Sequence, residues 1–310
     1  MGKEDFIRID NVTKRFGKQI VLNNLSLSIP FTGIFGIMGL SGCGKTTLLN
    51  VIIGFWRPDS GAVYYNGINI REHQRVMNQL FGFATQAGSV YPKLTVEENL
   101  EYFGRLYNMQ QQDIKKRIEE LLKLVELEDS RHVLAEELST GMYRRLDIAC
   151  SMIHNPKILI LDEPTGNLDP VLRKKLMALI KRIDDNGTKV IITSHLLGEI
   201  EKICDTLAII HHGKILEMGS PDELKDKYTK DQVIKIETKK KTYENLIPYL
   251  KRAGAKNIFQ KERYMYIYTR DPEKILITIL SYVKSKGDEL LNVEVSKPSI
   301  EEVFEAATRK

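Results

Sequence analysis

The sequence predicts an α/β domain followed by a smaller α+β domain, and three observations lead to this fold class. The 310 residues exceed the roughly 250–300 at which a single hydrophobic core usually stops growing. Alternating apolar and polar residues predict strands at 6–16 and 19–29, and Asn66-Gly67 between the apolar runs of 62–70 predicts a hairpin, so an antiparallel β subdomain is expected. Near-continuous apolar runs are typical of strands covered on both faces, and they occur at 33–38, 80–85, 157–161 and 189–194. We therefore expect domains at 1–220 and 221–310.

A helical insertion is predicted over about residues 90–155, between the second and third of the long apolar strands. Thr95 and Glu98 form a capping-box pattern, which marks the start of a helix. The run 111–127 has an apolar residue every three or four positions, as an amphipathic helix does. Ser139 is a favourable N-cap for a further helix. The insertion is therefore expected to contain several helices.

The pattern changes after Pro221. A strand, a helix, two strands, a helix and a strand follow one another over residues 231–295. This order, β-α-β-β-α-β, is the split βαβ arrangement of ferredoxin-like domains. A last helix is expected from Ser299 to Thr308, because Pro298 precedes it. The second domain is therefore expected to be a ferredoxin-like α+β unit.

Composition places the chain among ordinary globular proteins, with 42% apolar and 28% charged residues. The most apolar run, 29–40, is shorter than a membrane span and is interrupted by proline and glycine. The start of the chain lacks the apolar core of a signal peptide. The 3 cysteines lie far apart, which fits a reducing compartment. We therefore expect a cytoplasmic protein whose membrane role, if it has one, comes through a partner.

The net charge of +5 lies mostly in the second domain. A basic region can bind nucleic acid or anionic lipid, but it can also be a plain solvated surface. Here the basic residues are interleaved with acidic ones, which favours the solvated surface. No nucleic-acid partner is expected.

A phosphate-binding loop is predicted directly after the apolar run 33–38. The segment 39–46 matches the pattern G-x-x-x-x-G-K-[ST], in which glycines let successive backbone N–H groups face phosphates. Lys45 adds a positive charge, and Thr46 offers a hydroxyl to Mg²⁺. The residues expected to contact the nucleotide are Gly39, Ser41, Gly42, Cys43, Gly44, Lys45, Thr46 and Thr47. This pattern indicates a nucleoside-triphosphate site.

Two adjacent carboxylates, Asp162 and Glu163, follow the apolar run 157–161. Adjacent carboxylates repel each other unless a cation lies nearby, so the pair favours a bound metal. Asp162 is the expected ligand of Mg²⁺. Glu163 is then available to accept a proton from the attacking water or to orient it. The alternative is an acidic N-cap pair before a helix.

Gln86 and His195 follow the other two long apolar strands. Each has an ordinary alternative, since Gln86 could be a loop residue and His195 a helix cap. However, the carboxyl ends of parallel strands meet at one edge of a sheet, where ligands of open α/β sheets bind. We therefore expect both side chains to lie near the phosphate-binding loop.

With these residues in hand, the sequence resembles the ATP-binding cassette (ABC) ATPases over residues 6–220. In that family the two motifs above are called Walker A and Walker B. The resemblance implies that Gln86 is the Q-loop residue, which also helps to hold Mg²⁺, and that His195 is the switch histidine at the γ-phosphate. It further implies that Asp169, in the segment 166–169, lies in the D-loop, and that Phe16 stacks on adenine. A core position is the alternative for Phe16.

The segment 138–142, LSTGM, is similar to the family signature LSGGQ. Ser139 and Gly141 match the family pattern, whereas Thr140 and Met142 depart from it. The resemblance implies that this helix N-terminus faces the γ-phosphate held by a second ATPase chain, identical or not. Two chains would then enclose two ATP molecules head to tail. ATPase activity is therefore expected to require a dimer.

Short motifs also resemble the ATPase subunits of exporters that have a separate permease, of the antibiotic-resistance and sodium-export types. These motifs are the signature with its continuation at 143–146 and the run PSIEEVF at 298–304. The implied function is a transport ATPase at the inner face of the cell membrane, with ATP and Mg²⁺ as cofactors. Aromatic residues after Gln86 predict either a groove for a permease helix or ordinary packing.

Other cassette ATPases act in DNA repair or on the ribosome, and this class is the alternative function. DNA-repair types carry long coiled coils or zinc modules between Walker A and the signature, for which the gap from Lys45 to Ser139 is too short. Ribosome types join two cassettes in one chain, and this chain has one. A further alternative is an ATP-driven clamp with slow hydrolysis.

Cys43 lies inside the phosphate-binding loop, at a helix N-terminus and close to Lys45. Both features lower the pKa of a thiol. We therefore expect a reactive Cys43 that nucleotide protects from maleimide reagents, and the alternative is an inert small residue at a variable position.

Overall fold

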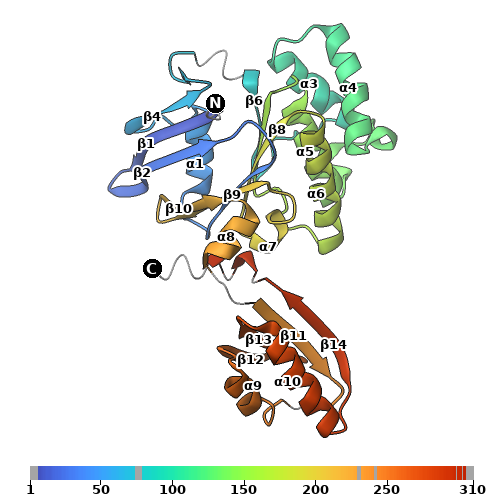
Figure 1. Cartoon of the computed structure of the whole chain (residues 1–310). Helices are drawn as coiled ribbons and strands as arrows, with labels where there is room; N and C mark the ends of the chain where they lie inside the picture. The colour runs from blue at the N-terminus through green and yellow to red at the C-terminus, as the bar shows by residue number, and fades with distance from the viewer. Residues whose placement is uncertain are drawn as a thin grey trace. The chain divides into compact units, whose positions relative to one another are not determined.

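The computed structural model describes residues 6–73, 79–228, 232–240, 243–297, 299–301 and 303–304. The chain divides into two compact units, Met1–Pro221 and Asp222–Lys310 (Figure 1). No helix within the described residues is both long enough and apolar enough to span a bilayer.

A six-stranded sheet forms the centre of the first unit. Its strand order is β10-β9-β3-β8-β7-β6, and every neighbouring pair is parallel except β10 with β9. The long apolar strands of the prediction are present, and β3, β7 and β8 are buried along their whole length, as expected for a sheet covered on both faces. Strands β9 and β10 form a hairpin, and its turn at His212 and Gly213 has positive φ at both residues. The strands are β3 (Phe35–Met38), β6 (Phe81–Ala84), β7 (Ile158–Asp162), β8 (Lys189–Ser194), β9 (Thr206–His211) and β10 (Lys214–Gly219).

The predicted antiparallel strands form a second sheet, in the order β2-β1-β4-β5. Asn66 and Gly67 both have positive φ, at 45° and 78°, and they connect β4 to β5 as the sequence predicts. Helix α1 (Lys45–Ile52) contributes its apolar side chains to a core shared by both sheets. The strands are β1 (Ile7–Phe16), β2 (Gln19–Ile29), β4 (Ser60–Tyr65) and β5 (Ile68–Asn69).

The helical insertion lies between β6 and β7, as predicted (Figure 1). The capping box is present, since the Thr95 hydroxyl accepts from the Glu98 N–H and the Glu98 carboxylate accepts from the Thr95 N–H. Ser139 caps α5, because its hydroxyl accepts from the Met142 N–H. The helices are α3 (Val96–Leu106), α4 (Gln111–Val125), the 3₁₀ turns η1 (Glu128–Ser130) and η2 (Ala135–Glu137), and α5 (Thr140–Met152).

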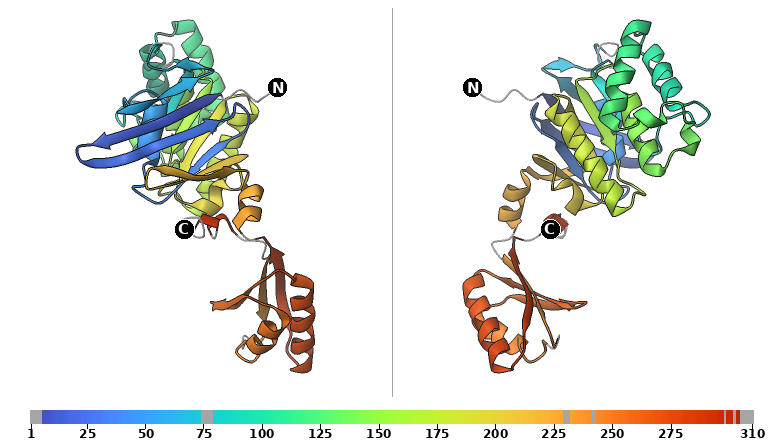
Figure 2. Two further views of the ribbon diagram at one scale, coloured as in Figure 1. Left: turned by 60° about the vertical axis from the view of Figure 1, so that its left-hand side comes forward. Right: turned by 90° about the vertical axis from the view of Figure 1, so that its right-hand side faces the viewer.

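Two helices follow β7 and β8. Helix α6 (Pro170–Asp185) packs on β8 and covers one face of the parallel sheet (Figure 2). The carboxylate of Asp169 caps α6 by accepting from the N–H groups of Val171 and Leu172. The short helix α7 (Leu197–Ile200) begins just after His195. Glu163 and His195, which follow β7 and β8, therefore lie in the segments that connect these strands to α6 and α7.

The second unit contains one four-stranded antiparallel sheet, in the order β12-β13-β11-β14. Helices α9 and α10 share an apolar core with β11 and β13. Residues 300–301 and 303–304 of the expected last helix are helical, while Glu302 and 305–308, together with the preceding Pro298, lie outside the described residues. The elements are α8 (Pro221–Tyr228), β11 (Gln232–Thr238), α9 (Ile247–Ala253), β12 (Asn257–Lys261), β13 (Tyr264–Thr269), α10 (Pro272–Ser285) and β14 (Leu290–Ser296).

Candidate functional site

The carboxyl ends of β3, β6, β7 and β8 bring four predicted polar segments together. The phosphate-binding loop follows β3, Gln86 follows β6, Asp162 ends β7 and His195 follows β8. Because these strands are parallel neighbours, all four segments meet at one edge of the sheet. The sequence prediction of a shared edge is confirmed.

The phosphate-binding loop adopts a conformation that depends on its glycines. Gly42 and Gly44 have φ values of 77° and 109°, which residues other than glycine rarely adopt. A Cβ atom at Gly39 would lie 2.5 Å from both the Cys43 Sγ and the Ile210 O. Beside the loop is a pocket of about 190 Å³, lined by Val21, Ser41, Gly42, Gly44, Lys45, Thr46, Thr47, Gln86 and Glu163. Helix α1 begins at this pocket, so its unpaired N–H groups favour an anion there.

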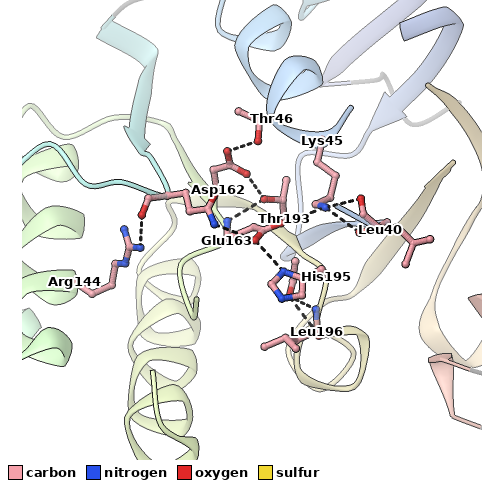
Figure 3. A network of polar contacts seen from close by, with 12 residues as sticks. Leu40, Lys45, Thr46, Arg144, Asp162, Glu163, Thr193, His195 and Leu196 are labelled. Atoms are coloured by element: carbon pink, nitrogen blue, oxygen red, sulfur yellow. Dashed lines mark hydrogen bonds and ion pairs between the residues drawn. The ribbon is translucent and has the colours of Figure 1, made fainter. Parts of the chain in front are cut away.

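Lys45 is 5% exposed and makes three polar contacts. Its Nζ donates to the carbonyl oxygens of Gly39 at 2.8 Å and Leu40 at 3.1 Å, and it lies 3.2 Å from the Glu163 Oε1 (Figure 3). The ammonium group is thus held at the mouth of the loop, between backbone oxygens and a carboxylate. From this position it can attract phosphate.

Glu163 is the point at which the predicted catalytic side chains meet. Its Oε2 lies 2.9 Å from the His195 Nδ1 and accepts from the Gln86 Nε2 at 3.5 Å (Figure 3). Its backbone φ is 48°, a left-handed conformation that costs energy in a residue other than glycine. Such strain persists only where the surrounding structure holds it. The carboxylate can accept a proton from a water molecule near the loop.

Asp162 forms a second polar cluster beside the loop. Its Oδ2 accepts from the Thr46 hydroxyl at 2.7 Å, and its Oδ1 accepts from the Thr193 hydroxyl at 2.5 Å. Thr193 also accepts from the Glu163 N–H at 3.0 Å. The sequence prediction missed Thr193, because a threonine two residues before a histidine carries no recognised spacing rule. Its position inside the buried strand β8 was the only available signal.

Phe16 lies at the end of β1 and is 41% exposed, so the alternative of a core position is wrong. Its ring packs edge to face against Trp56, with a centroid distance of 5.3 Å. Phe16 can therefore offer a π-face to a planar ligand. Trp56 is a neighbouring aromatic that the sequence prediction did not select.

Ser139, Gly141 and Asp169 are not among the described residues that line the pocket at the loop. Ser139 is exposed at the first turn of α5. A Cβ atom at Gly141 would lie 2.9 Å from the Leu172 Cδ2 of α6, so the start of α5 abuts the start of α6. The N-terminus of α5, with the exposed Ser139, is therefore separate from the pocket at the loop.

The expectation of an acidic Cys43 thiol is wrong. Cys43 is half-buried, and loss of solvation raises the pKa of its thiol above the usual value. Lys45 and backbone N–H groups lower that pKa, but they act less strongly than burial does. Proximity to a cation in the sequence was therefore not enough to predict reactivity.

Comparison with known proteins identifies the family. Residues 22–166 match the family model described as ABC transporter. The chain is 32% identical over 300 residues to the Nod factor export ATP-binding protein I of Rhizobium sp. (strain N33), covering 96% of this chain and 95% of that protein. The chain belongs to the ABC transporter family. It is an ATP-binding subunit of an ABC transporter, and subunits of this kind hydrolyse ATP.

Two further similarities agree with this assignment. The ABC subunit is 29% identical over 300 residues to the linearmycin resistance ATP-binding protein LnrL of Bacillus subtilis (strain 168), covering 96% of each chain. A solved ATP-binding subunit of an ABC transporter aligns with a TM-score of 0.64 at 25% identity, covering 72% of this chain and 93% of that one. The resemblance to ABC ATPases drawn from the sequence motifs is confirmed.

Proposed function

We propose that this ABC subunit hydrolyses ATP in sites that two ATPase chains complete together, and that it thereby powers a separate membrane permease. One observation carries the proposal. The phosphate-binding pocket and the exposed N-terminus of α5 lie on different surfaces of one chain, although the family signature belongs to the nucleotide site. Each chain can therefore supply one half of two composite sites.

Within one chain, the loop 39–47 would hold the phosphates through its backbone N–H groups and Lys45. Glu163 would accept a proton from the attacking water or orient it. The contact between His195 and Glu163 would hold the carboxylate in place and set the imidazole beside the γ-phosphate. Phe16 would stack on the adenine ring. Catalysis would come mainly from positioning and electrostatic stabilisation.

The residues at the loop fit Mg²⁺. Thr46 and Asp162 offer a hydroxyl and a carboxylate oxygen within 2.7 Å of each other, and Gln86 adds an amide oxygen nearby. Mg²⁺ prefers oxygen ligands and is commonly held by one or two carboxylates together with substrate phosphates. When bound, it would neutralise the charge that develops on the phosphate oxygens.

The second chain would contribute Ser139 and Gly141 at the γ-phosphate, and Asp169 near the dimer interface. The first turn of α5 has N–H groups without helical partners, which favour an anion. A Cβ atom at Gly141 would meet the Leu172 side chain of α6, so a side chain there requires Leu172 to move.

Mixing two inactive variants tests the composite site. Lys45→Ala removes the phosphate contact but keeps the signature, whereas Ser139→Arg blocks the signature but keeps the loop. A mixed dimer holds one intact site, so we expect ATPase activity to return on mixing while each variant alone stays inactive. If the mixture stays as inactive as its components although mixed dimers form, the two surfaces do not build one site.

The permease partner would dock on the insertion. Tyr91, Tyr102 and Leu106 are 45%, 37% and 58% exposed, and the rings of Tyr91 and Tyr102 pack edge to face at 4.7 Å. Such an aromatic surface after Gln86 suits a helix from another chain. The chain would then be a cytoplasmic protein held at the inner face of the membrane through its permease.

Charge introduced into this surface tests the docking. Leu106→Glu is expected to leave the ATPase activity of the isolated subunit unchanged and to abolish transport by the complex. Ile68→Glu on β5 is the matched control, because Ile68 is also an exposed apolar residue, at 46%. Glu98 is unsuitable for this test, since its side chain caps α3. Normal transport by Leu106→Glu contradicts the docking proposal.

Export is the proposed direction of transport. The relatives with printed functions include a Nod factor export protein and a linearmycin resistance protein, and each aligns over 96% of this chain. The residues of the ATP site do not select a cargo, so none is proposed.

We further propose that 222–310 is a ferredoxin-like accessory domain. Two features support it. The elements run β-α-β-β-α-β, and the strand that is last in the chain pairs antiparallel with the first, β11. The first strand in turn lies beside the third, β13, as this arrangement requires.

A further inference from the structure

Side chains on one face of α5 form hydrogen bonds with the backbone of residues 83–90, which we call the Gln86 loop. Four polar side chains make these contacts, and Asp147 lies three or four residues from each of the other three, which is the spacing of neighbours on a helix. Each bonds to backbone between Phe83 and Val90, or to another member of the group. The four residues are Tyr143, Arg144, Asp147 and Ser151, and we call them the α5 clasp.

Arg144 is the centre of the clasp. Its Nη1 donates to the Thr85 O at 2.8 Å and its Nη2 donates to the Gln86 O at 2.7 Å. The planar guanidinium fits two adjacent carbonyl groups, which a lysine ammonium on a flexible stem does not. Arg144 is 9% exposed, so solvent does not compete strongly for these bonds. The carbonyl of Gln86 itself is thus fixed to α5.

Asp147 fastens the other end of the loop. It is fully buried, its Oδ1 accepts from the Ser89 N–H at 2.8 Å, and its Oδ2 lies 3.4 Å from the Arg144 Nη1. Burial raises the pKa of this carboxyl, and the Ser89 N–H and Arg144 lower it. An Arg–Asp pair three residues apart on a helix is usually a weak surface pair, but burial and backbone bonds make this one different.

The remaining members extend the attachment along the loop. The Tyr143 hydroxyl donates to the Val90 O at 3.3 Å, and the Ser151 hydroxyl donates to the Phe83 O at 3.1 Å. A Cβ atom at Gly88 would lie 3.0 Å from the Tyr143 ring. The backbone from 83 to 90 is therefore held at several points along one helix.

From these contacts we propose that Arg144, supported by Asp147, is a positioning residue for Gln86. It fixes the backbone from which the Gln86 amide reaches Glu163 and Mg²⁺. It also makes Gln86 and the first turn of α5, with Ser139, parts of one rigid element. The proposal rests on the proposed role of Gln86 in holding the metal.

Epistasis between Arg144 and Gln86 tests this. Arg144→Lys keeps the charge beside Asp147 but not the paired bonds, and a misplacement of about 1 Å can lower a rate up to a hundredfold. We expect about a tenfold lower kcat, a several-fold higher Mg²⁺ concentration for half-maximal activity, and a KM for ATP within about twofold. In a Gln86→Ala background, Arg144→Lys is expected to have no further effect.

Arg145→Lys is the matched control. Arg145 lies on the same helix and also donates to two backbone carbonyl groups, those of Val125 and Glu126. These carbonyls end α4 and are remote in sequence from Gln86, so kcat and Mg²⁺ dependence are expected to stay unchanged. A second variant, Asp147→Asn, keeps an acceptor for the Ser89 N–H and loses the charge. It is expected to give the same loss of kcat, again masked by Gln86→Ala.

The outcomes separate the two proposals. If Arg144→Lys lowers kcat by the same factor with and without Gln86, it acts elsewhere and the positioning role is overturned. If Gln86→Ala itself leaves kcat and Mg²⁺ dependence unchanged, the proposed role of Gln86 fails first. Should Arg144→Lys prevent folding, the masked loss in Asp147→Asn decides the question, and an unmasked loss there overturns the proposal as well.

Discussion

Thr193 connects the two carboxylate residues of the ATP site, and removing its hydroxyl group is expected to slow hydrolysis. The hydroxyl donates to the Asp162 Oδ1 at 2.5 Å and accepts from the Glu163 N–H at 3.0 Å. Thr193→Val replaces the hydroxyl with a methyl group of similar size, so packing in the fully buried strand β8 is preserved. Both carboxylate residues then lose a fixed partner.

The expected magnitude follows from these two bonds. A hydrogen bond to a charged group contributes about 1.5–3 kcal/mol, and one between neutral groups about 0.5–1.5 kcal/mol. If both bonds hold the transition-state geometry, the lower sum of about 2 kcal/mol corresponds to roughly a 30-fold lower kcat. The KM for ATP is expected to change less than about twofold, because Lys45 and the loop backbone keep their contacts.

Steady-state ATPase kinetics at saturating Mg²⁺ measure this effect. Thr193→Ser keeps the hydroxyl group and is expected to retain most of the activity. Assays well below the unfolding temperature of each variant separate kinetics from stability. A kcat for Thr193→Val within twofold of the unmodified protein contradicts the proposed bridging role.

Three further predictions concern pH, thiol chemistry and packing. Burial lowers the pKa of His154 to about 4 from its usual 6.5, so the unfolded chain binds more protons as pH falls, and stability present above pH 6.5 is lost towards pH 4. Between pH 7 and pH 5, the free energy of unfolding in urea is therefore expected to fall by about 2 kcal/mol more in the unmodified protein than in a His154→Gln variant. His132→Gln, at an exposed histidine, is the control and is expected to alter this fall little. Cys43 is expected to react with maleimide more slowly than an exposed model thiol at pH 7, and a faster rate than the model thiol contradicts the burial effect. Gly141→Ala is expected to lower ATPase activity, because the added Cβ meets Leu172. Unchanged activity contradicts this prediction and shows that the start of α5 can shift freely.

The sequence predicted the features that follow from local spacing. Gly39 to Thr46 fit a known pattern, and the strand ends at Asp162 and His195 followed from apolar runs. The helix starts at Thr95 and Ser139 also followed, because capping depends on residues three positions apart. Parallel pairing then required these strand ends to meet at one edge.

What the sequence did not predict depends on contacts between distant segments. Arg144 and Asp147 have the spacing of a surface ion pair, and only the fold shows that the Gln86 loop buries them. Thr193 gains its role from β7, its neighbour in the sheet. The pKa of Cys43 was mispredicted because desolvation depends on tertiary packing, which outweighs the nearby charge of Lys45.

The central claim is that the α5 N-terminus of one chain completes the ATP site of another. The most direct test is the structure of the Glu163→Gln variant with MgATP, because loss of the carboxylate preserves the nucleotide. We predict that the Ser139 hydroxyl and the Gly141 N–H lie within about 3 Å of the γ-phosphate held by the loop of the partner chain. A structure in which Ser139 faces away from every bound triphosphate contradicts the claim.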